Sequence, residues 1–362
     1  MKILHCADLH IDSKMNTNFD SNKAEIRRNE VLYNFKRMAE YARNHEIETI
    51  MIAGDLFDTG IIHFSSLEFI LETIQNYGEI NFFYLFGNHD AEFLSNIQHR
   101  LPDNLYLFED TWTYYDISKK VTISGILTKK YNDSSLYDTL ELEKDRINLV
   151  LLHGMIEPVQ SKNDYSISIK GLKNKNIDYL ALGHIHTNSE GMIDARGHYV
   201  NPGCLEGRGF DEMGEHGFVV LHIEESSYEI QWEFVPFAKR KIFAVNLNVN
   251  GSGDANDIFD RTSHCLIQNQ IRHGDIVRIQ VCGSCAIGYG VIQKLIQERY
   301  GKDFFYLDVE NQTSITVDYS KYMYDHTLKG EFIRTVYQDK ELSEQEKIQI
   351  ITCGIERLGG VV

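Results

Sequence analysis

The chain has 362 residues, of which 43% are hydrophobic and 25% are charged, a composition typical of a folded globular protein. No run approaches the roughly 20 apolar residues of a membrane span, and the polar residues after the first strand pattern are unlike a secretory signal. The net charge of −17 argues against unaided wrapping of nucleic acid, although carboxylates that hold metal ions contribute to the same total. We therefore expect a cytoplasmic protein whose six cysteines are reduced.

Alternating strand and helix patterns predict an α/β fold from residue 1 to about residue 235. Short apolar runs bounded by loop residues predict buried strands at 2–7, 48–53, 81–86, 148–153 and 178–182. Amphipathic stretches between the first three strands predict helices at 24–44 and 65–77. Later segments of alternating polarity predict antiparallel strands at 217–222 and 228–235. This order of elements is typical of sheets with helices on their outer faces.

The pattern changes near residue 240, where a short basic stretch begins a second region. In order, the region predicts a strand, a helix, a strand, a helix and a strand, at 242–249, 258–270, 275–282, 290–300 and 304–309. A last helix is predicted at 342–358, where Ser343 and Glu346 match a capping box. We divide the chain into a main domain, a small α/β domain and a helical tail, at 1–238, 239–325 and 326–362.

Five short motifs carry residues that can bind metals or transfer protons, and each one ends or follows a predicted strand. They are Asp8-Leu9-His10, Gly54-Asp55-Leu56-Phe57-Asp58, Gly87-Asn88-His89-Asp90, His153-Gly154 and Gly183-His184-Ile185-His186. Polar residues at the carboxyl ends of several strands meet at one edge of an open α/β sheet. Because side chains two positions apart on an extended segment point to the same side, Asp8/His10 and His184/His186 should each direct two groups to one site.

These residue types suit a pair of divalent cations. Two cations about 3.5–4 Å apart can clamp the attacking and leaving oxygens of a phosphoryl displacement. Their mixed nitrogen and oxygen ligands favour manganese, iron or zinc over a thiolate-bound metal. Taken singly, each motif has an ordinary explanation, such as a turn for Gly-Asn-His-Asp or a satisfied core histidine for His153. Five together, each after an apolar strand, favour a two-metal phosphoesterase.

The motif set resembles that of the calcineurin-like metallophosphoesterase superfamily over residues 1 to about 235. The resemblance implies a sandwich of two mixed β-sheets flanked by helices. The metal ligands that it implies are Asp8, His10 and His186 for one cation, Asn88, His153 and His184 for the other, and Asp55 as the bridge. It also implies that His89 protonates the leaving oxygen or stabilises the phosphorane, and that Asp58 orients His89.

Within the superfamily, the likeness is closer to the SbcD-type DNA-repair exonucleases, bacterial relatives of the meiotic-recombination repair nuclease. It rests on residues 8–13, on residues 54–58 and on 201–212, where Cys204 stands in place of a serine; this last segment most resembles the Firmicute-type DNA-repair phosphoesterases. The likeness implies DNA as substrate and two divalent cations, with Mn²⁺ expected and Fe²⁺, Zn²⁺ or Mg²⁺ as alternatives. It also implies an SMC-like (SbcC-type) coiled-coil ATPase partner and a homodimer.

The same likeness implies roles for the rest of the chain. The small α/β domain would cap DNA, and the helical tail would dock the ATPase or else pack on its own chain.

Arg208 could bind a phosphate, or it could pair with Glu206 or Asp211. Cys282 and Cys285 form a Cys-x-x-Cys sequence, but no second pair stands at a spacing that would complete a structural zinc site.

Three functions stay open at this stage. The first is a manganese-dependent DNA exonuclease, which could also cut internally, regulated by the ATPase. The second is the same chemistry on a small nucleotide or a phosphomonoester, which the negative charge favours. The third is a non-catalytic scaffold of the same fold, which is disfavoured because every ligand position is filled.

Overall fold

The computed structural model describes residues 1–15, 19–58, 62–90, 101–157, 163–284, 288–313 and 322–357. The chain forms two compact units, Met1–Lys241 and Ile242–Val362. None of the helices in the described ranges is both long enough and apolar enough to cross a membrane.

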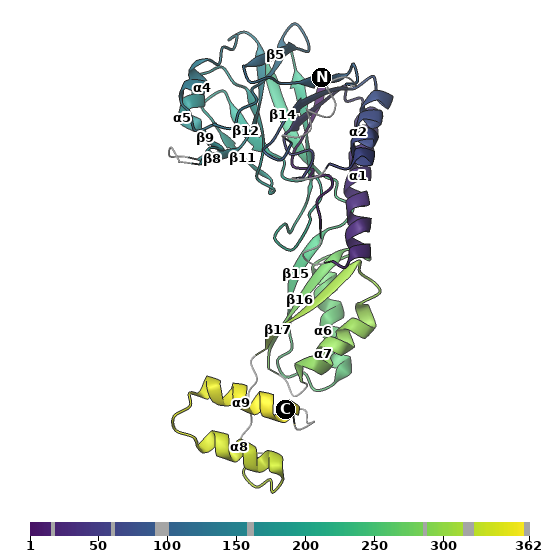
Figure 1. Cartoon of the computed structure of the whole chain (residues 1–362), viewed down its shortest axis with the longest axis vertical. Helices are drawn as coiled ribbons and strands as arrows, with labels where there is room; N and C mark the ends of the chain where they lie inside the picture. The colour runs from purple at the N-terminus through teal and green to yellow at the C-terminus, as the bar shows by residue number, and fades with distance from the viewer. Residues whose placement is uncertain are drawn as a thin grey trace. The chain divides into compact units, whose positions relative to one another are not determined.

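The first unit contains two six-stranded mixed sheets (Figure 1). One sheet has the strand order β14-β13-β1-β2-β3-β4. Its strands are β1 (Lys2–Cys6), β2 (Thr49–Ala53), β3 (Asn81–Leu85), β4 (Leu105–Leu107), β13 (Gly217–Glu224) and β14 (Glu229–Pro236). Strands β1 to β4 are parallel, whereas β13 pairs antiparallel with both β1 and β14. The carboxyl ends of β1, β2 and β3 therefore lie at one edge.

The other sheet has the strand order β11-β12-β10-β7-β6-β5. Its strands are β5 (Thr113–Asp116), β6 (Val121–Gly125), β7 (Ile147–His153), β10 (Tyr179–Gly183), β11 (Ser189–Met192) and β12 (His198–Asn201). The four central strands are parallel, and the edge strands β5 and β11 are antiparallel to their neighbours. A separate parallel pair, β8 (Met155–Glu157) and β9 (Ser166–Ser168), follows β7.

Two long helices belong to the first sheet. Helix α1 (Ser21–Asn44) begins after Asp20, whose side chain accepts a hydrogen bond from the backbone N–H of Lys23 at 2.9 Å. This N-cap starts the helix three residues before the predicted start. Phe35 of α1 packs against Phe82 of β3, with ring centroids 6.1 Å apart, so α1 covers the sheet's outer face. The second long helix is α2 (Phe64–Asn76). The described residues of this unit also form two short helices, α4 (Ser135–Asp138) and α5 (Ile169–Leu172).

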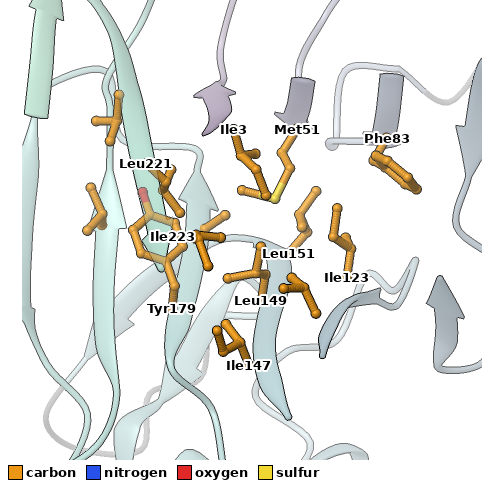
Figure 2. Close-up of a cluster of buried hydrophobic side chains, with 14 of the residues drawn as sticks. Ile3, Met51, Phe83, Ile123, Ile147, Leu149, Leu151, Tyr179, Leu221 and Ile223 are labelled. Atoms are coloured by element: carbon orange, nitrogen blue, oxygen red, sulfur yellow. The ribbon is translucent and has the colours of Figure 1, made fainter. Parts of the chain in front are cut away.

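The two sheets meet face to face in one hydrophobic core (Figure 2). Ile3 and Met51 point into it from the first sheet, and Leu149 and Leu151 point into it from the second. The intervening side chains of β7 face another buried cluster on the opposite side, so every residue of this strand is buried. A strand that is apolar on both faces is typical of the centre of a parallel sheet. This packing holds the carboxyl ends of the central strands in fixed positions.

The second unit begins with a small α/β module. It comprises β15 (Ile242–Asn248), α6 (Ala255–Gln268), β16 (Ile276–Gly283), α7 (Tyr289–Tyr300) and β17 (Tyr306–Thr313). The three strands form a parallel sheet in the order β15-β16-β17. Ile258 of α6 and Ile292 of α7 join the strand residues Val277 and Ile279 in one core.

A pair of helices follows, α8 (Leu328–Gln338) and α9 (Glu344–Arg357). Ile333, Val336 and Ile351 pack together between them. The predicted capping box is present, because Ser343 N–H donates to the Glu346 carboxylate at 2.8 Å and Glu346 N–H donates to Ser343 Oγ at 3.3 Å. Helix α8 was not predicted from the sequence, and residue 358 of the predicted last helix lies outside the described residues. The predicted α/β fold, with two mixed sheets flanked by helices, is confirmed.

Candidate metal centre

The five motifs occupy the carboxyl ends of parallel strands in both sheets. Asp8 follows β1, Asp55 follows β2 and Asn88 follows β3 in the first sheet. His153 ends β7 and His184 follows β10 in the second sheet. Since the two sheets pack face to face, these strand ends lie close together, and residues far apart in the sequence share one site.

Three groups of side chains, two of which share His10, each bring ligand atoms within 4.8 Å of one another. The groups are Asp8, His10 and His186; Asp55, His153 and His184; and His10, Asp58 and His89. The amide of Asn88 joins the second group, because its Oδ1 lies 3.1 Å from His153 Nε2 and 3.2 Å from His184 Nδ1. The structure therefore brings together all seven side chains that the resemblance implies as metal ligands, and both implied catalytic residues.

Asp55 lies between the groups. Its Oδ2 is 3.2 Å from His153 Nε2 on one side and 3.9 Å from His10 Nε2 on the other. Its Oδ1 accepts a hydrogen bond from His89 N–H at 3.0 Å. A carboxylate in this position can touch two cations at once, which is the role of a bridging ligand.

Two histidines have one ring nitrogen engaged by an acceptor behind the site. His153 Nδ1 lies 2.8 Å from the carbonyl oxygen of Ala53, and His186 Nδ1 lies 2.6 Å from Glu212 Oε1. When such a ring is neutral and its Nδ1–H donates to this oxygen, its Nε2 has a lone pair that faces the site. His186 Nε2 is 3.1 Å from His10 Nε2. Nitrogens that converge in this way fit a cation between them, and the oxygen acceptors behind them resemble the outer contacts of many metal-bound histidines.

The carboxylates of the site differ in their electrostatic surroundings. Burial raises the pKa of Asp8 to about 7, and a bound cation would favour its ionised form. Burial opposes the ionisation of Asp55, but the hydrogen bond and charge of His153 outweigh burial and hold the pKa of Asp55 below its usual range. Burial also opposes the charging of His153, yet Asp55 raises the pKa of His153 to about 9. Burial and the charge of His153 lower the pKa of His184 to about 4.

The backbone at the site is not extended, so the expected strand-like geometry of residues 8–10 and 184–186 is wrong. Strand β1 ends at Cys6 and β10 ends at Gly183. The φ angles of Asp8, His10 and His184 are 51°, 47° and 90°, in the left-handed region that residues with a Cβ rarely adopt. Hydrogen bonds hold this conformation, since Asp8 N–H donates to the Gly54 carbonyl and His10 N–H to the Asp55 carbonyl. The side chains still converge, through turns rather than through strand periodicity.

A glycine allows the third motif to approach the second. A Cβ at Gly87 would lie 2.0 Å from Asp55 Oδ1 and 2.5 Å from Asp55 N, which no side chain could tolerate. Residue 87 must therefore be glycine if the Asp55 carboxylate is to keep its place.

His89 and Asp58 lie beside the candidate metal ligands. Asp58 Oδ1 is 3.3 Å from His89 Nδ1 and 3.4 Å from His10 Nδ1. His89 Nε2 is 4.0 Å from Asp55 Oδ2, so this nitrogen faces the Asp55 carboxylate. Asp58 is thus close to two imidazoles, and not only to the one that the resemblance implies.

Two carboxylates whose function the sequence did not reveal support the site. Asp90 is buried and accepts hydrogen bonds from Gly87 N–H at 2.8 Å and from Phe57 N–H at 2.9 Å. Burial raises the pKa of Asp90 to about 6. Glu212 is the acceptor for His186 described above. Asp90 stands in a recognised motif and could have been considered, whereas no local signal marks Glu212.

Arg208 has a different partner from the two that the sequence suggested. Its Nη2 donates to Glu212 Oε1 at 2.6 Å, and its backbone N–H donates to Glu212 Oε2 at 2.8 Å. Glu206 instead binds the buried Arg27 at 3.0 Å. The Arg208 guanidinium is only 3.0 Å from His186 Nδ1, so it lies at the margin of the site.

Cys282 and Cys285 belong to the second unit. Cys282 is half-buried, and its thiol donates to the carbonyl oxygen of Leu247 at 3.5 Å. Cys285 lies outside the described residues, so the structure does not test the Cys-x-x-Cys sequence.

The fold and the converging ligands define a metal-dependent phosphoesterase. A sequence model of the calcineurin-like phosphoesterases matches residues 1–188, more than half of the chain. The protein belongs to this dimetal-dependent family of phosphoester hydrolases.

Among the proteins similar to the chain are two relatives found by sequence and one solved structure. It is 23% identical over 248 residues to the uncharacterized metallophosphoesterase YhaO of Bacillus subtilis, covering 64% of this chain and 60% of the relative. It is 23% identical over 270 residues to the DNA double-strand break repair protein Mre11 of Methanosarcina acetivorans, covering 69% of this chain and 41% of the relative. The chain thus spans less than two thirds of either relative. A dimetal phosphatase from Danio rerio aligns at 10% identity with a TM-score of 0.42, covering 62% of this chain and 93% of that one.

Proposed function

We propose that this protein is a two-metal nuclease that hydrolyses DNA phosphodiesters, as an exonuclease that can also cut internally. One observation carries the catalytic part of the proposal: Asp55 lies between two sets of nitrogen and oxygen ligands at the ends of strands from both sheets. Such a set suits a pair of divalent cations and little else.

The proposed ligands divide between two cations. Asp8, His10 and His186 would hold the first, Asn88, His153 and His184 would hold the second, and Asp55 would bridge them. Bound cations would supply Lewis-acid activation of the phosphate and of a water nucleophile. Mn²⁺ is the proposed metal, and the mixed imidazole and oxygen set suits it. The same set would also accept Fe²⁺, Zn²⁺ or Mg²⁺, but it does not select a thiolate-bound metal.

His89 is the proposed proton donor. Its Nε2 faces Asp55, and its Nδ1 faces Asp58 Oδ1 at 3.3 Å. A carboxylate beside Nδ1 orients the ring, so that Nε2–H can be delivered to the leaving oxygen. Asp58 acts through this ring and is a positioning residue.

The assignment of DNA as substrate rests on the sequence. The similarity to Mre11 covers 69% of this chain, and the segment 201–212 resembles the SbcD-type branch. A minimal phosphodiesterase would not need a second unit of the size of Ile242–Val362. We propose that its α/β module caps DNA, and that an SbcC-type ATPase binds the helical tail, where Leu328 is 72% and Tyr337 is 42% exposed. A partner would supply the basic surface that a chain of net charge −17 lacks, and a homodimer is the proposed assembly.

The negative charge favours a second candidate function. A small nucleotide or a phosphomonoester would need no basic groove, and the same ligands could hydrolyse it. A scaffold without activity ranks last, because no proposed ligand is missing from the site.

The test compares DNA with a small diester. The Mn²⁺-loaded protein is incubated with end-labelled single- and double-stranded DNA, with and without a purified SbcC-type ATPase, and in parallel with bis-(p-nitrophenyl) phosphate. We expect cutting of DNA, its loss in Asp55→Asn, and full activity in Asp145→Asn, which changes an exposed carboxylate at the opposite ends of the strands. Hydrolysis of the small diester without any DNA cutting would refute the nuclease proposal. No hydrolysis of either substrate with any of the four metals would favour the scaffold.

A further inference from the structure

A cavity of about 270 Å³ opens on one side of the candidate metal centre. Asn88 and His153 form part of its wall. Tyr165, another wall residue, stacks on His184, with ring centroids 5.3 Å apart and ring planes 18° from parallel. The cavity thus adjoins all three of the side chains proposed for the second cation. None of the three proposed for the first cation alone lines it.

The remaining wall is largely apolar and aromatic. Phe86 and Leu127 line the cavity together with the ring of Tyr165. Lys129 also lines it, is exposed, and makes no ion pair with any residue in the described ranges. The cavity therefore offers apolar and aromatic surfaces, with the exposed Lys129 beside them and the buried, hydrogen-bonded Asp90 in its wall. A phosphate alone would use the charge but not the rings, whereas a planar base can stack on an aromatic ring.

We propose that this cavity binds the base of the nucleotide whose phosphate lies at the metal centre, with Tyr165 as the stacking surface. The inference rests on the proposed function, because it assumes a nucleotide substrate. Small-molecule pockets usually have volumes of about 300–1,000 Å³, so a cavity of this size accepts one ring system rather than a run of nucleotides. Stacking on an aromatic side chain tolerates all bases, which suits an enzyme that must process any sequence. Lys129 is placed to contact the phosphate of the same or the adjoining nucleotide.

The test uses two ligands that share a phosphomonoester and differ in the nucleoside. Thymidine 5′-monophosphate and methyl phosphate are titrated by calorimetry into the full-length, Mn²⁺-loaded protein. The variants are Tyr165→Ala and Tyr165→Phe, with Tyr33→Ala as a control, because Tyr33 is 56% exposed on α1. Bound Mn²⁺ is counted in each variant, so that a loss of metal would be seen.

We expect the wild-type protein to bind the thymidine nucleotide at least about tenfold more tightly than methyl phosphate, the size of effect that base stacking gives. Tyr165→Ala should remove this preference and leave methyl phosphate binding unchanged. Tyr165→Phe and Tyr33→Ala should behave like the wild type. Equal affinities for the two ligands in the wild type would overturn the proposal, and so would an equal loss for both ligands in Tyr165→Ala. A loss in Tyr165→Phe matching that in Tyr165→Ala would assign recognition to the hydroxyl and overturn the stacking role.

The two proposals can fail separately. If the nucleotide preference depends on Tyr165 but no DNA is cut, the cavity assignment stands for a free nucleotide and the nuclease proposal fails. If DNA is cut but the base adds nothing to affinity, the nuclease proposal stands and the cavity assignment fails.

Discussion

Glu212 offers a direct test of how the proposed first cation is held. Its Oε1 accepts the Nδ1–H of His186 at 2.6 Å and also binds the guanidinium of Arg208 at 2.6 Å. Burial opposes its ionisation, but these two partners outweigh burial and hold the pKa of Glu212 below its usual range. The carboxylate is therefore charged at neutral pH. The substitution Glu212→Gln keeps the length of the side chain and removes the charge that makes His186 Nε2 more basic.

The size of the effect follows from that contact. Removing a hydrogen-bonded partner of a metal-bound histidine typically lowers metal affinity about 10- to 100-fold, which corresponds to about 1.4–2.8 kcal/mol. His186 shares its group with Asp8 and His10, so this loss should fall on one of two bound Mn²⁺ ions. The other ion should be little affected, because no hydrogen bond or ion pair in the described residues joins Glu212 to His153 or His184.

The assay is calorimetric titration of Mn²⁺ into chelator-treated protein, which resolves two affinities. Glu215→Gln is the matched control, because it makes the same change at an exposed carboxylate of the same segment that pairs with Lys241. Urea unfolding without metal shows whether the fold is intact. Unchanged affinities for both ions in Glu212→Gln would refute the reasoning. An equal loss at both sites would show general loosening instead of an effect through His186.

Three further predictions follow from the same geometry. His89→Ala should keep two bound Mn²⁺ ions and lose about 100- to 10,000-fold in turnover, the range for a general acid; a fully active variant would remove His89 from the mechanism. His184→Ala should lower the metal count as well as the activity, and an unchanged count by elemental analysis would contradict its role as a ligand. Glu30→Gln should lower the free energy of unfolding at pH 7 by about 3 kcal/mol, because it leaves the buried Arg27 short of a partner. Burial opposes the ionisation of Glu30, but Arg240 and Arg27 lower its pKa from 4.5 to about 2. The stabilisation by its charge is therefore present above pH 4.5 and is lost as the pH falls towards 2. Urea unfolding should show the difference in free energy of unfolding between variant and wild type narrowing over that window, and a constant difference would exclude the charge as its source.

The sequence predicts the strands that carry the motifs well, because those strands are buried on both faces. Strand β7 contains the continuous apolar run Leu149–Leu152 and lies within one residue of its predicted start. The edge strands β5 and β11 are different. Ser189–Met192 is mostly exposed and has no strand pattern of its own, so it becomes a strand only through its antiparallel pairing with β12. Elements that depend on pairing were therefore missed.

Charged partners outside the motifs were also beyond the sequence. The segment 206–212 contains three acidic residues near Arg208, and spacing alone favours none of them. The fold decides, because Glu206 is taken by Arg27 of α1 while Glu212 reaches both Arg208 and His186. A contact between residues 179 positions apart sets which carboxylate is free for the site. That choice depends on how α1 packs on the first sheet, which no local pattern encodes.

The backbone of the motifs explains why the right residues were found through a partly wrong argument. The sequence suggested that Asp8/His10 and His184/His186 converge because they lie on extended segments. Instead, Asp8, His10, Asp55 and His184 all have positive φ angles. Each such residue costs about 1–3 kcal/mol, which together is a large share of the roughly 5–15 kcal/mol that stabilises a typical domain. The structure keeps this conformation because loop-to-loop hydrogen bonds such as Asp8 N–H to Gly54 O fix it between two rigid strand ends. A strained backbone at four of the seven proposed ligands is what a site needs if its ligands must be in place before the cations arrive, so the strain itself supports a binding function for these turns.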